Sequence, residues 1–106
     1  MLSFDVRGGD LSLALPKPRR QADPAYLDYV RSHFCLVPGC RRKAEAHHLV
    51  SRGAGGSDYT AVPLCREHHW AVHNAGPEHF ERVVDVNLWR VAAELLADYF
   101  TRRENP

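Results

Sequence analysis

The sequence lacks any apolar run close to the ~20 residues that cross a bilayer, which excludes a membrane-spanning helix. Its first ten residues, MLSFDVRGGD, lack the basic head and apolar core of a secretory signal, so we expect a cytoplasmic protein. Cysteine is scarce, with three in 106 residues, and an odd number argues against a framework of disulfides. A chain of this length is expected to form one domain.

Net charge is nearly absent, at +1, but the charges are unevenly distributed. Residues 1–43 carry eight Lys or Arg against four acidic residues, whereas residues 44–106 are net acidic. A basic half indicates a polyanionic partner, although a solvated charged surface would give the same pattern. The composition, 44% hydrophobic and 25% charged, excludes a wholly disordered or collagen-like chain.

Residues 1–22 are expected to form an N-terminal segment of their own. Two short alternating runs, LSFDV and LSLAL, flank Gly8 and Gly9, which favours a β-hairpin or an extended arm. Pro16 and Pro18 then predict an extended basic linker, because proline disfavours helix in the residue before it.

Residues 23–106 are expected to form the single domain. Asp23 followed by Pro24 predicts an N-cap and the first position of a helix over 24–32. Pattern and turn residues predict further elements: strands over 45–51 and 60–64, a Gly-rich loop over 52–58, a helix over 66–74, and two helices within 77–103 broken near 85–87. We expect the periodic apolar residues of the last helix, together with Trp70 and Trp89, to lie in the core. Stacking platforms are the alternative interpretation of the two tryptophans.

The three cysteines follow the spacing of a structural metal site. Cys35 and Cys40 flank a Pro-Gly turn, and Cys65 follows 25 residues after Cys40. Two short ligand pairs at such a separation are typical of structural zinc. The fourth ligand is either His68 or His69. Three buried free thiols are the alternative interpretation.

Five of the seven histidines fall between residues 47 and 73. His69 and His73, four residues apart on the predicted helix, share one face. His47 and His48 lie on a predicted strand, so one of them would reach that face. Three imidazoles with open coordination positions indicate a catalytic metal site, and the remaining histidine could act as a base. Histidines that are simply packed in the core or on the surface are the alternative.

From Cys35 to His73 the sequence resembles the HNH endonucleases, which have the ββα-metal fold. The motifs that carry the resemblance are C-LVPG-C, AHHLVSRGAGGSD and VPLCREHHWAVH. They are most similar to small phage and prophage proteins of the group that includes the RecA-dependent nuclease of phage P1. The resemblance implies an α+β fold with a ββα-metal core over 35–76, a zinc knuckle, an N-terminal hairpin or arm and C-terminal helices.

The resemblance also implies roles for the histidines. His48 matches the general base of the family. His47, His69 and His73 match the ligands of a catalytic divalent ion, which we leave open as Mg²⁺, Mn²⁺, Ni²⁺ or Zn²⁺. Thr60 stands where the family has an Asn that braces the loop and orients the base, and its hydroxyl could supply part of that role.

The knuckle implied by the resemblance binds a structural Zn²⁺ through Cys35, Cys40, Cys65 and His68. The implied activity is hydrolysis of DNA phosphodiester bonds, by nicking or by cutting both strands, with 5′ phosphate and 3′ hydroxyl products. The alternative function is a non-catalytic, zinc-stabilised nucleic-acid-binding module, which needs the knuckle but has no need of His48.

Basic residues are the candidate DNA contacts. Arg52 precedes a run of glycines that would let the backbone approach a phosphate. The other candidates lie before the first strand and on the linker: Arg41, Arg42, Lys43, Arg19 and Arg20. None of these reads base edges in an obvious way, so we expect double-stranded DNA bound with weak sequence preference. The resemblance implies a phage or prophage origin and leaves room for a phage protein partner.

Overall fold

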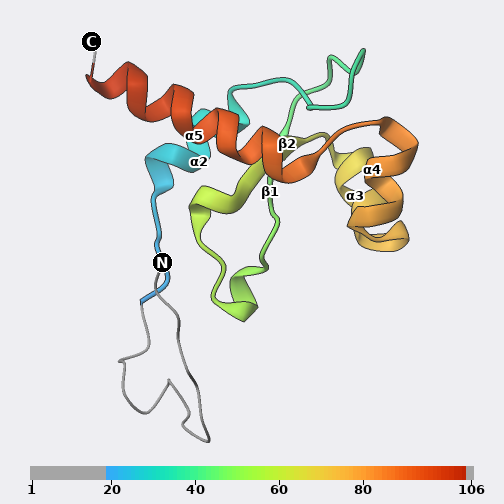
Figure 1. Cartoon of the computed structure of the whole chain (residues 1–106), viewed down its shortest axis with the longest axis horizontal. Coiled ribbons are helices and arrows are strands. Elements are labelled where there is room, and N and C mark those ends of the chain that lie inside the picture. The colour runs from blue at the N-terminus through green and yellow to red at the C-terminus, as the bar shows by residue number, and fades with distance from the viewer. Residues whose placement is uncertain (1–18, 105–106) are drawn as a thin grey trace, which may run out of the picture.

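The computed structural model describes residues 19–104, and the predicted hairpin or arm lies mostly outside them, in residues 1–18. The described chain is a small α+β domain, as predicted (Figure 1). Its elements are α2 (Pro24–Arg31), β1 (Glu45–His48), β2 (Ala61–Leu64), α3 (Arg66–Ala75), α4 (Pro77–Val84) and α5 (Leu88–Glu104). Two 3₁₀ turns, η1 (Arg52–Ala54) and η2 (Asp58–Thr60), lie between the strands. Among these helices, none combines the length and apolar character that a bilayer crossing requires.

The two strands pair in antiparallel fashion, with His47 opposite Val62 and His48 opposite Ala61. All four residues of β2 are buried, because helices contact the strand from more than one side. Val62 belongs to a core formed with α3, α4 and α5, whereas Ala61 packs against Tyr26 of α2. Side chains alternate along a strand, so neighbouring residues of β1 face these two different environments.

The helix ends follow the predicted signals. The Asp23 side chain accepts a hydrogen bond from the Tyr26 backbone N–H at 3.0 Å, which caps α2 as predicted. The predicted break in the C-terminal helices is confirmed at Asp85, which has a left-handed backbone (φ 55°) between α4 and α5. In Figure 1, α5 runs along α2 over the sheet, while α3 and α4 form the opposite end of the domain.

The first strand is shorter than predicted: β1 ends at His48 and does not continue to residue 51. The Ser51 side chain accepts a hydrogen bond from Ala54 N–H and starts a 3₁₀ turn instead. The chain then folds back so closely that a Cβ on Gly56 would lie 1.8 Å from the Val50 carbonyl oxygen. This glycine is therefore needed for the loop's own packing.

The prediction that both tryptophans lie in the core is wrong. Trp70 on α3 is 68% exposed and Trp89 on α5 is 55% exposed. Val72 is the residue of α3 that enters the core, and Leu88 and Ala92 are among those of α5. Each tryptophan is displaced around its helix from these buried positions, so the core is closed without either indole.

Candidate metal centres and active site

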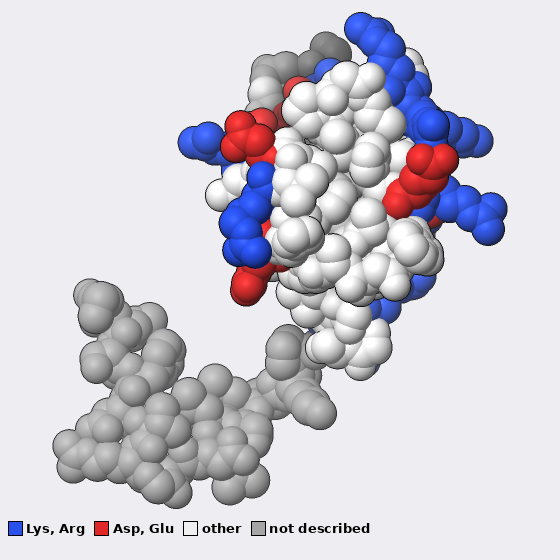
Figure 2. Space-filling model, turned by 90° about the vertical axis from the view of Figure 1, so that its right-hand side faces the viewer, with Lys and Arg blue, Asp and Glu red and all other residues white. Residues whose placement is uncertain are grey.

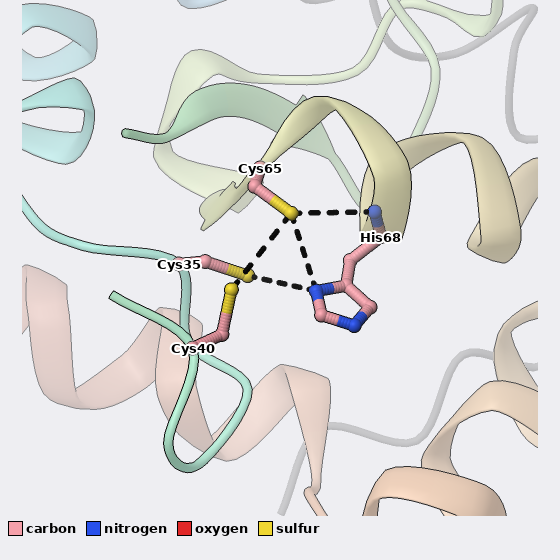
Figure 3. Close-up of side chains that lie close together, drawn as sticks. All are labelled: Cys35, Cys40, Cys65 and His68. Atoms are coloured by element: carbon pink, nitrogen blue, oxygen red, sulfur yellow. Dashed lines mark hydrogen bonds between the residues drawn. The ribbon is translucent and has the colours of Figure 1, made fainter. Parts of the chain in front are cut away.

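Three cysteines and one histidine converge at the junction of β2 and α3 (Figure 3). Cys65 caps the N-terminus of α3, His68 lies in its first turn, and Cys35 and Cys40 reach them from the loop after α2. The Nδ1 atom of His68 lies 3.3 Å from the Cys35 sulfur and 3.2 Å from the Cys65 sulfur. The sulfurs of Cys40 and Cys65 are 3.9 Å apart.

These distances fit one tetrahedral ion. Two thiolates bound to zinc at ~2.3 Å lie about 3.8 Å from each other, whereas a disulfide requires ~2.05 Å. The four ligand atoms all lie within 4.8 Å of one another, and His68 takes the fourth position rather than His69. The predicted Cys/His cluster is therefore confirmed as a group that could hold a metal ion.

The buried Cys35 thiol needs a nearby cation to become a good ligand. Burial raises the pKa of Cys35 to about 11, so this thiol is protonated at neutral pH when nothing positive is near it. The Arg42 backbone N–H, by contrast, lowers the pKa of Cys40. Metal binding at this cluster must therefore displace protons, and it couples to folding because Cys35 and Cys65 are part of the core.

A second cluster joins β1 to the other face of α3. The rings of His47, His69 and His73 lie 4.8 to 5.1 Å apart, and one ligand atom from each lies within 4.8 Å of the others. His47 is only 8% exposed, whereas His73 is exposed. One side of this histidine triad is thus packed against the protein and the other is open to solvent.

Glu45 orients one of the triad residues. Its Oε1 lies 2.9 Å from Nδ1 of His69, which leaves Nε2 of that ring for a metal ion. A carboxylate behind a ligating histidine is a common arrangement in metal sites. Glu45 was not among the residues predicted for this site, although it lies two residues before His47 and so on the same face of the strand.

His47, the buried member of the triad, is neutral at neutral pH. Burial and the neighbouring histidines lower the pKa of His47 to about 4. Metal ions bind the neutral form of histidine, so this ring is ready to bind at neutral pH without losing a proton.

Acid should therefore weaken the fold through His47. An unfolded histidine titrates near ~6.5, so between about pH 6.5 and pH 4 the unfolded chain binds a proton that folded His47 does not. We expect the free energy of unfolding to fall by about 1 kcal/mol from this residue between pH 7.5 and pH 5.5. Denaturant melts of wild type and His47→Gln at both pH values measure the difference, and an equal loss in both proteins would contradict it.

His48 faces the opposite side of β1 and contacts a buried carboxylate. Its Nε2 lies 2.8 Å from Oδ1 of Asp58, which is 1% exposed. The same oxygen accepts a hydrogen bond from Nη1 of Arg20 at 2.7 Å, and Oδ2 accepts one from the Asp23 backbone N–H at 2.8 Å. Asp58 therefore joins the start of α2, the linker before it and the end of β1.

These contacts define the tautomer of His48. Burial acts to raise the pKa of Asp58, but the hydrogen bonds from His48, Arg20 and Asp23 outweigh it and hold that pKa well below its usual range. An ionised carboxylate only accepts hydrogen bonds, so Nε2 of His48 carries the proton. In the neutral ring, Nδ1 then has the free lone pair.

Removing the charge of Asp58 should be costly. In Asp58→Asn the amide replaces an acceptor that serves Arg20 and His48, and we expect the free energy of unfolding to fall by about 3 kcal/mol. Asp28→Asn is the matched control, because its side chain is 81% exposed and pairs with Arg31 on the same helix. Chemical denaturation compares the two variants, and equal stabilities would show that the Asp58 network contributes little.

Thr60 braces the loop, which is part of its expected role. Its hydroxyl donates to the Ser57 carbonyl at 2.8 Å and accepts from Val50 N–H at 3.5 Å. The contact that orients His48 comes instead from Asp58, which the sequence analysis did not single out. No local pattern marks Asp58, because Arg20, the residue paired with it, lies 38 positions away in the chain.

His48 shares a cleft with two residues of the triad. The cleft has a volume of about 470 Å³ and is lined by His47, His48 and His73 at one end. Leu49 and Ser51 after β1, Gly76, and residues of α3, α4 and α5 form the rest of its wall. His48 is thus among the residues that line the cleft, although its imidazole is hydrogen-bonded to Asp58 on the opposite side of β1 from His47.

The predicted DNA contacts fall into three groups. Arg20 is turned inward to Asp58, and Arg42 pairs with Glu67. Lys43 lines a hollow of about 380 Å³ with two arginines that sequence reasoning missed, Arg31 and Arg66. The remaining candidates are exposed, namely Arg19, Arg41 and Arg52. Figure 2, which views the end of the molecule with α3 and α4, shows Lys and Arg, with Asp and Glu among them, along two edges of a mostly uncharged surface.

The described chain is thus a small α+β domain with two groups of side chains that could hold metal ions. By sequence, the protein belongs to the family described as "Protein of unknown function (DUF968)", which matches residues 1–97. It is 31% identical over 77 residues to the "Uncharacterized protein YdfU" of Escherichia coli strain K12, covering 68% of this chain and 22% of that protein. The chain therefore matches only about a fifth of its relative. No solved structure shows significant similarity.

Proposed function

We propose that this protein is a metal-dependent DNA endonuclease with an HNH-type ββα-metal core. The observation that carries the proposal is the histidine triad, in which one ligand atom each from His47, His69 and His73 lies within 4.8 Å of the others. In the proposed core, β1 and α3 supply the histidines, β2 pairs with β1, and the Cys/His cluster holds a structural zinc. The sequence resemblance and this arrangement support the same assignment.

His47, His69 and His73 would hold the catalytic divalent ion through their imidazole nitrogens. When bound, such an ion stabilises the negative charge that develops on a phosphodiester and on its leaving oxygen. The triad suits this role because His73 is exposed and leaves one side of the site accessible. Glu45 fixes the ring of His69.

His48 would serve as the general base. Asp58 accepts a hydrogen bond from the Nε2–H group, so Nδ1 is the atom that takes a proton from the attacking water. The carboxylate also stabilises the positive charge that the ring then acquires. Asp58 is a positioning residue in this scheme, because it acts through His48.

The substrate assignment rests on positive charge beside the site. Arg31, Lys43 and Arg66 surround a hollow that also includes Glu45, and Glu45 contacts the triad through His69. Three cations in one concave surface suit the phosphates of a nucleic-acid backbone. This arrangement offers no base-specific contacts, which supports weak sequence preference.

A plasmid-nicking assay tests the proposal. Metal-stripped protein that has been reloaded with Mg²⁺, Mn²⁺, Ni²⁺ or Zn²⁺ is expected to convert supercoiled DNA to open-circle or linear forms. The ends should be ligatable, with 5′ phosphates and 3′ hydroxyls. If no metal supports cutting while DNA binding is intact, the chain is instead the zinc-stabilised binding module.

A further inference from the structure

The part of the cleft beyond the histidines is unsuited to phosphate. None of its lining residues is Lys or Arg, and two of them, Glu78 and Glu81, are acidic. Much of the remaining wall is apolar and includes Val72 and Leu88. A DNA backbone entering this space would meet two carboxylates and no Lys or Arg in the cleft wall, so an uncharged group is better suited to the space next to a bound phosphate.

Trp89 gives the cleft an aromatic wall. Its side chain is 55% exposed, although Leu88, the preceding residue, is 1% exposed and anchors the start of α5 in the core. The Leu88 backbone N–H donates to Oε2 of Glu81 at 2.7 Å, which ties the cleft's carboxylate to the same turn. The indole is thus held on a fixed element, with much of its surface free to contact a ligand.

From these features we propose that the cleft binds one unpaired nucleobase next to the phosphate at the histidine triad, and that Trp89 stacks on it. This inference rests on the proposed function for the position of the phosphate. An aromatic ring stacks on any base, and carboxylates can accept hydrogen bonds from amino groups of bases. A base paired within a duplex is not available to the cleft unless it is flipped out at a cost in free energy.

The inference therefore assigns a preference for unpaired or distorted DNA over a regular duplex. The expectation from the sequence was different: double-stranded DNA bound with weak sequence preference. The volume of about 470 Å³ lies within the range of small-molecule sites, so a single base has room beside the histidines.

The experiment uses the two tryptophans of the chain, Trp70 and Trp89. In the double variant His48→Ala/Trp70→Phe, Trp89 is the sole tryptophan and bound DNA is not cut. It is titrated with a duplex carrying one bulged base, with the same duplex carrying a bulged abasic site, and with the fully paired duplex. We expect the bulged base to quench Trp89 fluorescence and to bind roughly tenfold more tightly than the abasic bulge.

Anisotropy of labelled DNA provides the matched control. Trp89→Ala should lose the difference between the two bulges, whereas Trp70→Ala, which removes a more exposed indole that does not line the cleft, should keep it. Equal binding of base and abasic bulges, or binding without quenching of Trp89, overturns the inference. Quenching by the bulged base in a protein whose wild type never cuts DNA would overturn the nuclease proposal and leave the nucleobase site standing.

Discussion

Replacing His48 with Ala is expected to lower the rate of plasmid nicking by at least about 100-fold, because the general base is lost. The fold should survive, since Asp58 keeps its hydrogen bonds from Arg20 and from the Asp23 backbone. Zinc content, melting temperature and DNA affinity should therefore stay near those of the wild type. Nicking rates at saturating protein measure the effect.

The control for this variant is His79→Ala. His79 is an exposed histidine on α4 that does not line the cleft, so its removal should leave nicking unchanged. If His48→Ala unfolds the protein, the residue is structural and the proposed role has no support from the loss of activity. A folded His48→Ala that still nicks at the wild-type rate would rule out His48 as the base.

Replacing Cys65 with Ser is expected to remove the structural zinc and most of the stability together. The side chain is 2% exposed, lies in the core with Val62 and Leu64, and contributes a sulfur to the metal cluster. Structural zinc contributes directly to folding free energy, so we expect a loss of at least about 4 kcal/mol, enough to unfold a domain of this size. Thermal melts and zinc analysis by mass spectrometry measure both quantities.

A strong chelator added to the wild type serves as the comparison. It should reproduce the lowered melting temperature of Cys65→Ser, because both treatments remove the same ion. An unchanged melting temperature with one zinc per chain in Cys65→Ser would mean that the cluster binds no structural metal.

The metal clusters were predictable because each draws on local sequence geometry. Cys65 and His68 are three residues apart at a helix start, and His69 and His73 are one helical turn apart. The alternation of a strand placed His47 and His48 on opposite sides, as the structure has them. The caps at Asp23 and Asp85 likewise follow from short-range backbone chemistry.

What the sequence did not predict depends on contacts between distant residues. In the sequence, Asp58 is an ordinary loop residue. Its role depends on hydrogen bonds from Arg20, Asp23 and His48, which lie in separate parts of the fold. The same fold turns Arg20 inward, although its neighbour Arg19 is exposed. Periodicity and composition do not reveal these contacts between distant residues, because the partners share no fixed spacing in the sequence.

The two tryptophans show a different limit of prediction from sequence, which is the burial of individual large apolar residues. Large apolar residues are usually expected in the core, yet Val72, Leu88 and Ala92 already fill it. The sequence could not show that the core closes without Trp89, and the exposed indole is now a candidate for ligand binding.

The central claim is that the histidine triad and the Cys/His cluster bind separate ions with different roles. The most direct test is plasmid nicking by protein carrying one zinc per chain, before and after addition of a second divalent metal. The account predicts a folded, inactive protein that begins to nick only with the second ion, and no such gain in His69→Ala. Nicking at the same rate before and after the addition, or none in either case, would contradict it.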